Sequence, residues 1–269
     1  MSTSIRLHER SFIGYVGLSA LLTVWLVGCQ SNPRSAPEGY IGGTVMSSQG
    51  PEAGVWVVAE TKDLPTPFIK IVVTDDEGRF VLPELPDTSY GIWVRGYGLA
   101  DSKPVQAKPG DDALMLTATI ARSPEEAAKV FPPDYWLSLL EPPAKNEFPG
   151  TGSKGNGISP GMRSQAQWIH NLKRSCHLCH QMGNEITRTT AHMADMNFAS
   201  SKEAWDYRVR LGVRGGEMNS GFTRFGRQRA LEVFPDWTDR IAAGELPLMP
   251  PRPTGIERNL VVTLWDWGT

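Results

Sequence analysis

Short apolar runs, separated by Gly, Pro and Asp, set the pattern of the chain between residues 38 and 122. The runs lie at 41–46, 55–60, 69–74, 79–82, 90–95 and 114–120. β-Branched and aromatic residues dominate them, which favours strands over helices. Several short strands at this spacing predict an all-β sandwich.

A polar segment between two of these runs predicts a hairpin turn. Residues 75–78 read Asp-Asp-Glu-Gly, and the glycine can adopt a positive φ at little cost. An alternative interpretation of the three acidic side chains is a calcium site. A solvated turn is the favoured interpretation.

Apolar residues at helical spacing begin after residue 160 and predict an all-α domain over 161–269. The predicted helices lie at 164–173, 201–211, 228–243 and 256–267. In the closing segment, four apolar residues fall on one helical face: Ile256, Leu260, Leu264 and Trp267.

Residues 123–160 separate the two patterns and are predicted to be a linker or a long surface loop. The first part, 124–136, predicts a short helix. The rest contains Pro142-Pro143 and several glycines among Ser, Lys and Asn, a composition typical of loops.

The amino terminus has the pattern of an export signal. Arg6 and Arg10 precede the uncharged, apolar stretch 11–28, as in secretory signals. The alternative is a single transmembrane helix, since this length is near the lower limit for crossing a bilayer. The end of the stretch, Leu-Val-Gly followed by Cys29, resembles the bacterial lipoprotein signal box.

That resemblance implies a signal peptide over 1–28, acylation of Cys29 and a polar tether over 29–37. Acyl chains on Cys29 would anchor the protein to a membrane and place its body in the cell envelope, facing the periplasm. Gln30, which stands where an Asp would favour the inner membrane, favours the outer membrane.

Composition restricts the function classes. The chain has 269 residues with 27 Lys+Arg against 29 Asp+Glu, a net charge of −2. This balance gives no indication of nucleic-acid binding. Its three cysteines are too few for a disulfide scaffold, so each of them needs its own explanation.

The β-region resembles a known family in its turn and strand segments. It contains GGTV at 42–45, GVWV at 54–57, TDDEGRF at 74–80 and LP at 85–86. Together these segments are similar to the carboxypeptidase regulatory-like family. The resemblance implies a transthyretin-like sandwich over 38–122 that serves as an accessory module without catalytic residues of its own.

The most specific motif lies at 176–180, which read Cys-His-Leu-Cys-His. C-x-x-C-H is the attachment motif of c-type haem. On a helical turn, a spacing of three brings both sulfurs to one side, where they can add to the two vinyl groups of one porphyrin. Cys176 and Cys179 are therefore predicted to bind one haem c covalently, with His180 as the proximal iron ligand.

Three other interpretations of this motif compete with haem attachment. A thioredoxin-like C-x-x-C belongs in a βαβ setting, whereas this one lies in a helical segment. A structural zinc site needs four ligands, which only the two cysteines and the scattered His170, His177 and His192 could supply. A disulfide between the two cysteines would leave His180 without a role.

The helical region resembles the class I cytochromes c, in which a helix leads into the motif and a Met-Pro loop precedes the last helix. Here the loop reads Leu-Pro-Leu-Met-Pro-Pro around Met249. The resemblance implies Met249 as the sixth iron ligand, held by flanking prolines that fix φ. The alternatives are Met218, His192 or an open sixth position.

Arginines gather around a Gly-rich loop in the same region, at positions 208, 210, 214, 224, 227 and 229. Their planar groups suit carboxylates, so one or two of them could pair with haem propionates. The favoured interpretation is a solvated face, one that could dock an acidic redox partner.

Three functions remain open at this point. The first is a membrane-anchored carrier of single electrons, alone or as part of a larger redox protein, with redox proteins as partners. The second is a haem enzyme or sensor, peroxidase-like, with an open sixth position on the iron. The third is a structural or binding module whose haem is incidental. The whole chain is similar to bacterial proteins that join a carboxypeptidase regulatory-like module to a cytochrome c domain, in which a further large domain often follows.

Overall fold

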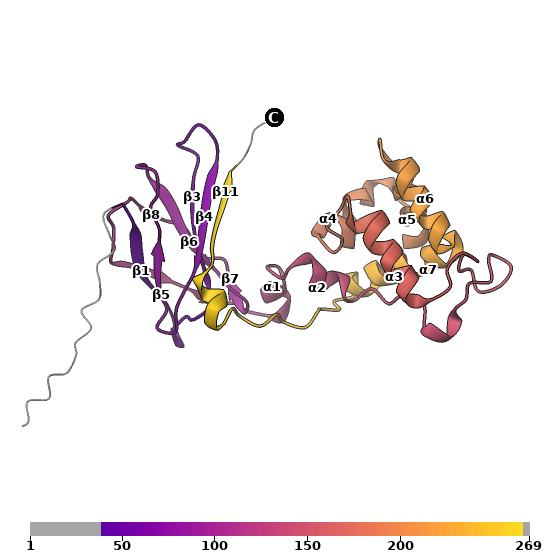
Figure 1. Ribbon diagram of the computed structural model, residues 1–269, viewed down its shortest axis with the longest axis horizontal. Helices are drawn as coiled ribbons and strands as arrows, with labels where there is room; N and C mark the ends of the chain where they lie inside the picture. Colours follow the sequence, from indigo (N-terminus) through magenta and orange to yellow (C-terminus); the bar gives the residue numbers. More distant parts are fainter. Residues whose placement is uncertain (1–38, 266–269) are drawn as a thin grey trace, which may run out of the picture. The chain divides into compact units, whose positions relative to one another are not determined.

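The structure is a computed structural model that describes residues 39–265. The predicted signal peptide, Cys29 and the tether lie outside the described residues. Strands fill the first part of the described chain and helices most of the second, while one strand, β11, follows the helices (Figure 1). Among residues 39–265, no helix is long and apolar enough to cross a membrane.

The strands between residues 41 and 120 agree with the six predicted runs. Those that the sequence missed, β2, β7 and β8, are only two or three residues long, which is too short to show an alternating pattern. The strands are β1 (Ile41–Ser47), β2 (Gly50–Pro51), β3 (Trp56–Thr61), β4 (Phe68–Val73), β5 (Arg79–Leu82), β6 (Tyr90–Arg95), β7 (Leu99–Ala100), β8 (Val105–Ala107), β9 (Leu114–Thr117) and β10 (Thr119–Ile120).

These strands form two larger sheets and one small one. The five-stranded sheet is antiparallel, in the order β11-β4-β3-β6-β8. In the four-stranded sheet, β1 pairs antiparallel with β2 and β5 and parallel with β9. The small sheet pairs β10 with β7. We call these strands, together with the loops between them, the β-part.

Both larger sheets contribute side chains to one apolar core. In β5, Phe80 and Leu82 are buried while Val81 between them is half exposed, because successive side chains of a strand alternate between its two faces. Buried residues from β1, β3 and β6 complete the core, among them Ile41, Val45, Val57, Ala59, Tyr90 and Ile92.

The predicted turn at 75–78 is present, but it does not make a hairpin. Gly78 has a φ of +73°, and the Asp75 N–H donates to the Arg79 carbonyl across the turn. The strands on either side, however, belong to different sheets: β4 pairs with β3 and β11, and β5 pairs with β1. The hairpin prediction was wrong because turn chemistry fixes the local bend and not the partner of each strand.

The predicted helices at 164–173, 201–211 and 228–243 are confirmed as α3, α5 and α7. In α3 the Ser164 side chain caps the first turn by accepting from the Gln167 N–H, which satisfies one of the free donors of the helix start. The helices are α1 (Pro124–Ala128), α2 (Pro133–Leu137), α3 (Gln165–Leu172), α4 (Glu185–Arg188), α5 (Ser201–Arg208), α6 (Gly215–Phe225) and α7 (Arg227–Ala242). We call residues 124–242 the helical part.

An aromatic cluster forms the centre of the helical part. The ring of Trp168 lies 4.6 Å from that of Phe225, and Phe234 lies 5.0 Å from Phe222 and 5.2 Å from Trp205, between ring centroids. All five side chains are buried. Such pairs stabilise a core beyond the area that they bury, and here they join α3, α5, α6 and α7.

Residues 123–160, predicted to be a linker or long surface loop, are mostly irregular, with α1, α2 and the short 3₁₀ helix η1 (Lys145–Glu147). The segment nevertheless supplies core residues. Ile158 is fully buried and Leu140 nearly so, and both pack in the helical core. The indole N–H of Trp237 donates to the Trp136 carbonyl at 3.0 Å. Much of this loop is therefore packed against helices.

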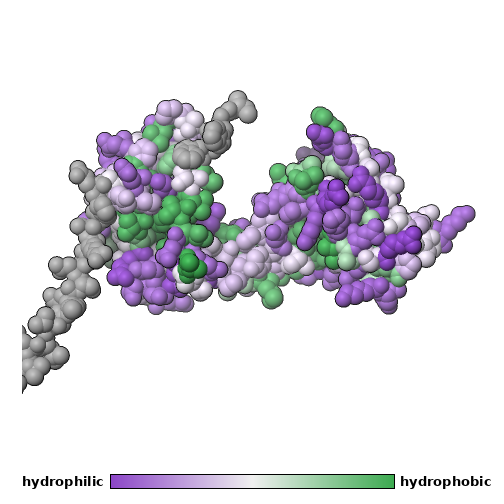
Figure 2. Space-filling model, viewed as in Figure 1, coloured by the Kyte–Doolittle hydropathy of each residue, from purple (hydrophilic) through white to green (hydrophobic). Residues whose placement is uncertain are grey.

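Over the described residues 256–265, the closing helix predicted at 256–267 is not formed, so the all-α prediction fails there. A 3₁₀ turn, η4 (Gly255–Asn259), leads into β11 (Val261–Trp265), which pairs antiparallel with β4. The run Val-Val-Thr at 261–263 favours a strand, and leucines four apart fit a helix as well as the ends of a strand. Hydrophobic side chains gather on the surface near β4 and β11 (Figure 2), where Val261 and Leu264 are about half exposed.

We expect Gly43→Ala to destabilise the β-part. A Cβ at Gly43 would lie 2.2 Å from the Leu114 carbonyl oxygen, so β1 and β9 would have to separate at a cost of about 1–3 kcal/mol. Gly91→Ala in β6 is the matched control, because its Cβ would meet nothing closer than 3.5 Å. Urea unfolding of both variants measures the difference. Equal free energies of unfolding would contradict the close approach of β1 and β9.

Candidate functional site

The Cys-His-Leu-Cys-His motif lies directly after α3. Trp168 and Leu172 on the buried face of α3 fix the helix against the core. The chain then widens into one π-helical turn, η2 (Lys173–His177). Isolated π turns of this kind are frequent at functional sites. Cys176 lies in this π-helical turn, and the motif continues beyond it.

Hydrogen bonds to one carbonyl hold the motif together. The N–H groups of Cys179 and His180 both donate to the Cys176 carbonyl, at 3.3 and 3.0 Å. The two cysteines therefore lie on a single turn, followed at once by His180. Both thiols are free, so Cys176 and Cys179 do not form a disulfide with each other.

The two thiols lie in different environments. Cys179 is exposed, whereas Cys176 is partly buried beside the helical core. Burial, with a smaller contribution from Cys179, raises the pKa of the Cys176 thiol to about 12. Removing the charged form from water accounts for this direction. Cys176 is therefore a neutral thiol at physiological pH.

His180 and the surroundings of the motif fit a haem group. His180 is exposed, and its imidazole has no hydrogen-bond or ion-pair partner among residues 39–265, so the ring is available to a metal. Large apolar side chains are uncovered in the motif and in the segments after it. These exposed residues are Leu178, Ile186, Met196, Tyr207, Leu211 and Val213. A flat apolar group attached at the cysteines could cover surface of this kind.

The loop after the motif is fixed to α2 by a close backbone approach. Gly183 has a φ of +93°, and a Cβ there would lie 2.0 Å from the Pro133 carbonyl oxygen. Arg188 donates to the Gly183 carbonyl at 2.9 Å and stacks over Trp136, 4.1 Å from its ring centroid. Only glycine fits here without strain, and the position of the loop relative to the motif is thereby set.

Arg208 holds the other end of the same loop. Its guanidinium donates to the carbonyls of Ile186, Thr187 and Thr189 and lies over the Trp205 ring. Burial lowers the pKa of Arg208 to about 10. Burial and the charge of Arg208 also lower the pKa of His192. The sequence gives no signal for this role of Arg208, which was predicted as one of a cluster of surface arginines, because the role depends on contacts distant in sequence.

The remaining arginines of the predicted cluster mostly form ion pairs. Arg210 and Arg227 share Asp206, Arg214 pairs with Glu217, and Arg229 pairs with Glu147 and Glu232. Arg224 instead donates to the hydroxyls of Ser175 and Ser220. Arg224 therefore contacts Ser175, the residue before Cys176, and has no carboxylate partner in the described residues.

Met249, predicted as the sixth ligand, lies beside the β-part. It is 61% exposed, and its Sδ lies 3.7 Å from the position that a Cβ on Gly98 would occupy. The structure gives no contact between Met249 and the motif within the described residues. Of the alternatives, Met218 is half buried against the core that also contacts Cys176, and His192 is exposed.

The other ligand sets that the sequence suggested are not brought together in the structure. His177 lies 3.6 Å from Asp134 through Nε2. Asp75 and Glu77 bind Arg79, and Asp76 binds Arg258. Across residues 39–265, no three His, Cys, Asp or Glu side chains form a group that could hold a metal ion.

Comparison with known proteins gives no family for the chain. No protein-family model matches the sequence, and no curated protein matches it either.

We expect Arg208→Lys to destabilise the helical part by about 2 kcal/mol, because a compact ammonium cannot reproduce the two-nitrogen fork with which the guanidinium reaches the three carbonyls, and some of them stay unpaired. Arg210→Lys is the matched control, since its exposed pair with Asp206 contributes little and lysine can replace it. Thermal unfolding monitored by circular dichroism compares them. Equal midpoints for the two variants would contradict the role given to Arg208.

Proposed function

We propose that this protein is an exported, membrane-anchored c-type cytochrome that transfers single electrons through one covalently bound haem c. One observation carries the proposal: two free thiols and an unpartnered imidazole lie on a single turn, closed on the Cys176 carbonyl. Uncovered apolar side chains in the segments that follow support it.

In this proposal, each residue of the motif has one task. The thiols of Cys176 and Cys179 would hold the haem by adding across its two vinyl groups, each sulfur bonding to one vinyl carbon and the thiol hydrogen going to the other. His180 would hold the iron through its imidazole. The group would supply an iron that alternates between ferrous and ferric states. The protein fixes its place through α3, the π turn and the loop held by Arg208.

The rest of the chain would serve this carrier. We take the β-part as a transthyretin-like sandwich, an accessory module related to the carboxypeptidase regulatory-like family, and the helical part as a relative of class I cytochromes c. Two sheets that share one core support the first assignment, and a helix that leads into the motif supports the second. Redox proteins would be the partners, in the periplasm.

A second candidate function is favoured by the position of Met249. If its sulfur stays beside Gly98, the iron keeps an open sixth position. Such a haem binds small ligands or peroxides, as in sensors and peroxidases. The electron carrier and the sensor or peroxidase therefore differ in whether the Met249 sulfur binds the iron.

We expect the haem to stay attached after denaturation. In a host with a haem c maturation system, wild-type protein should stain for haem on a denaturing gel, because thioether bonds survive unfolding. The double variant Cys176→Ala, Cys179→Ala should lose the stain completely. Leu178→Ala, which leaves both thiols in place, is the matched control. Purified wild-type protein that holds zinc and no haem would refute the proposal.

We expect Cys29 to carry the lipid. Cys29→Ser should abolish incorporation of labelled fatty acid and either leave the signal uncleaved or release the protein in soluble form, because two or more acyl chains are needed for stable anchoring. The wild type should fractionate with the outer membrane. Unchanged labelling and fractionation of the serine variant would contradict the lipoprotein assignment.

A further inference from the structure

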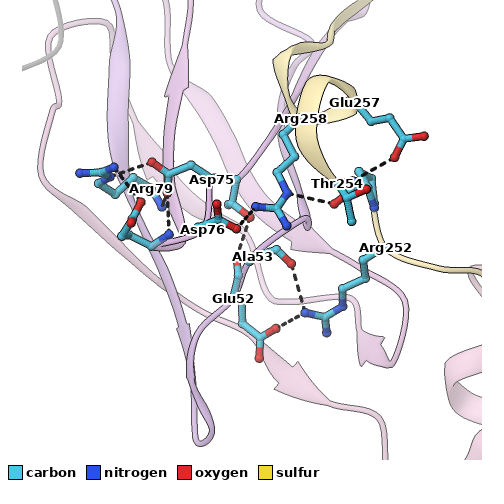
Figure 3. A network of polar contacts seen from close by, with 12 residues as sticks. Glu52, Ala53, Asp75, Asp76, Arg79, Arg252, Thr254, Glu257 and Arg258 are labelled. Atoms are coloured by element: carbon cyan, nitrogen blue, oxygen red, sulfur yellow. Dashed lines mark hydrogen bonds and ion pairs between the residues drawn. The ribbon is translucent and has the colours of Figure 1, made fainter.

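Residues 249–254, which we call the strap, are fastened to the β-part by Arg252. Its guanidinium donates to the Glu52 carboxylate at 2.5 Å and to the Ala53 carbonyl at 3.3 Å (Figure 3). It also donates to the Tyr97 carbonyl at 3.0 Å. The Glu52 side chain is only 6% exposed. A buried carboxylate without a paired cation is costly, so the ion pair with Glu52 favours the position that Arg252 has here.

The β-part presets the position of Glu52. The hydroxyl of Thr74, which is fully buried, donates to the Glu52 carbonyl at 2.6 Å and accepts from the Val55 N–H at 3.0 Å. The loop that carries Glu52 is therefore tied to the end of β4 by hydrogen bonds that do not involve the strap.

Both ends of the strap lie close against glycines. At Gly54, with a φ of +67°, a Cβ would lie 2.5 Å from the Pro253 carbonyl oxygen. At the other end, the Met249 sulfur lies against Gly98. Prolines at 250, 251 and 253 fix φ along the strap. Because the strap is stiff, the anchor at Arg252 also limits where Met249 can go.

We infer that Glu52 is a positioning residue for the haem site: through Arg252 it holds the Met249 sulfur beside Gly98 and withholds it from the iron. The inference rests on the proposed haem. Release of the strap would let the sulfur donate an electron pair to the iron as sixth ligand, with no change in oxidation state and no proton transfer. Glu52 would thus decide between the open and the six-coordinate forms.

The test compares Glu52→Gln with Asp76→Asn in the full-length holoprotein. Asp76 pairs with Arg258 just beyond the strap, but its side chain is 81% exposed, so it is a matched control at the same segment. Two quantities are measured: the sulfur-to-iron charge-transfer band of the oxidised protein, and amide hydrogen exchange over residues 252–258. Arg252→Gln breaks the same anchor from the other side, and far-ultraviolet circular dichroism reports whether each variant folds.

We expect no charge-transfer band in wild type or Asp76→Asn. Glu52→Gln and Arg252→Gln should develop the band, and adding Met249→Leu should remove it. Exchange over 252–258 should rise at least about tenfold in the Glu52 variant and stay close to wild type in the control.

Three results would overturn the inference while leaving the haem in place: a wild-type band that Met249→Leu removes, exchange that does not respond to Glu52→Gln, or a freed strap without a new band. Failure of the proposed function itself appears separately, as the absence of haem stain. Without haem the part of the inference that concerns the iron falls too, while the exchange measurement still decides whether Glu52 holds the strap.

Discussion

The packing of Trp168 between Phe225 and Phe234 is the contact on which the candidate site depends. Trp168 is fully buried, and it fixes α3 to α6 and α7. The motif begins four residues after Leu172 at the end of α3 and has few apolar contacts of its own. The aromatic core therefore sets the position of the motif, and a shift of the Trp168 ring would move Cys176 and Cys179 together.

Local chemistry predicted most of the elements but not their pairing. β-Branched runs marked the strands, and apolar residues at helical spacing over 164–173 marked α3 within a residue at each end. The turn at 75–78 was equally clear, but nothing in it specifies that β5 pairs with β1. Leucines four apart at 260 and 264 suggested a helix, where a β-branched run and an available edge of β4 gave a strand. Hydrophobic periodicity does not distinguish a helix from a strand in a segment this short, because its few apolar residues fit both.

In the candidate site, too, local motifs could be predicted from the sequence and long-range contacts could not. Cys176, Cys179 and His180 could be predicted as candidate haem-binding residues because the C-x-x-C-H spacing alone suggests that chemistry. Arg208 and Glu52 were not, since their roles require carbonyls or a guanidinium supplied by distant parts of the chain. For Met249, the resemblance gave a plausible ligand, and the structure gave a different neighbour. The ligand of a metal centre depends on tertiary contacts as much as on the loop in which it stands.

The pairing of β11 with β4 joins residues from opposite ends of the described chain, such as Val261 and Val72. During synthesis from the amino terminus, β4 forms long before β11 exists. Until then the run Phe-Ile-Lys-Ile-Val-Val at 68–73 is an open strand edge, available to any other extended chain. This edge of β4 therefore stays unpaired until the helical part has been made and β11 covers it.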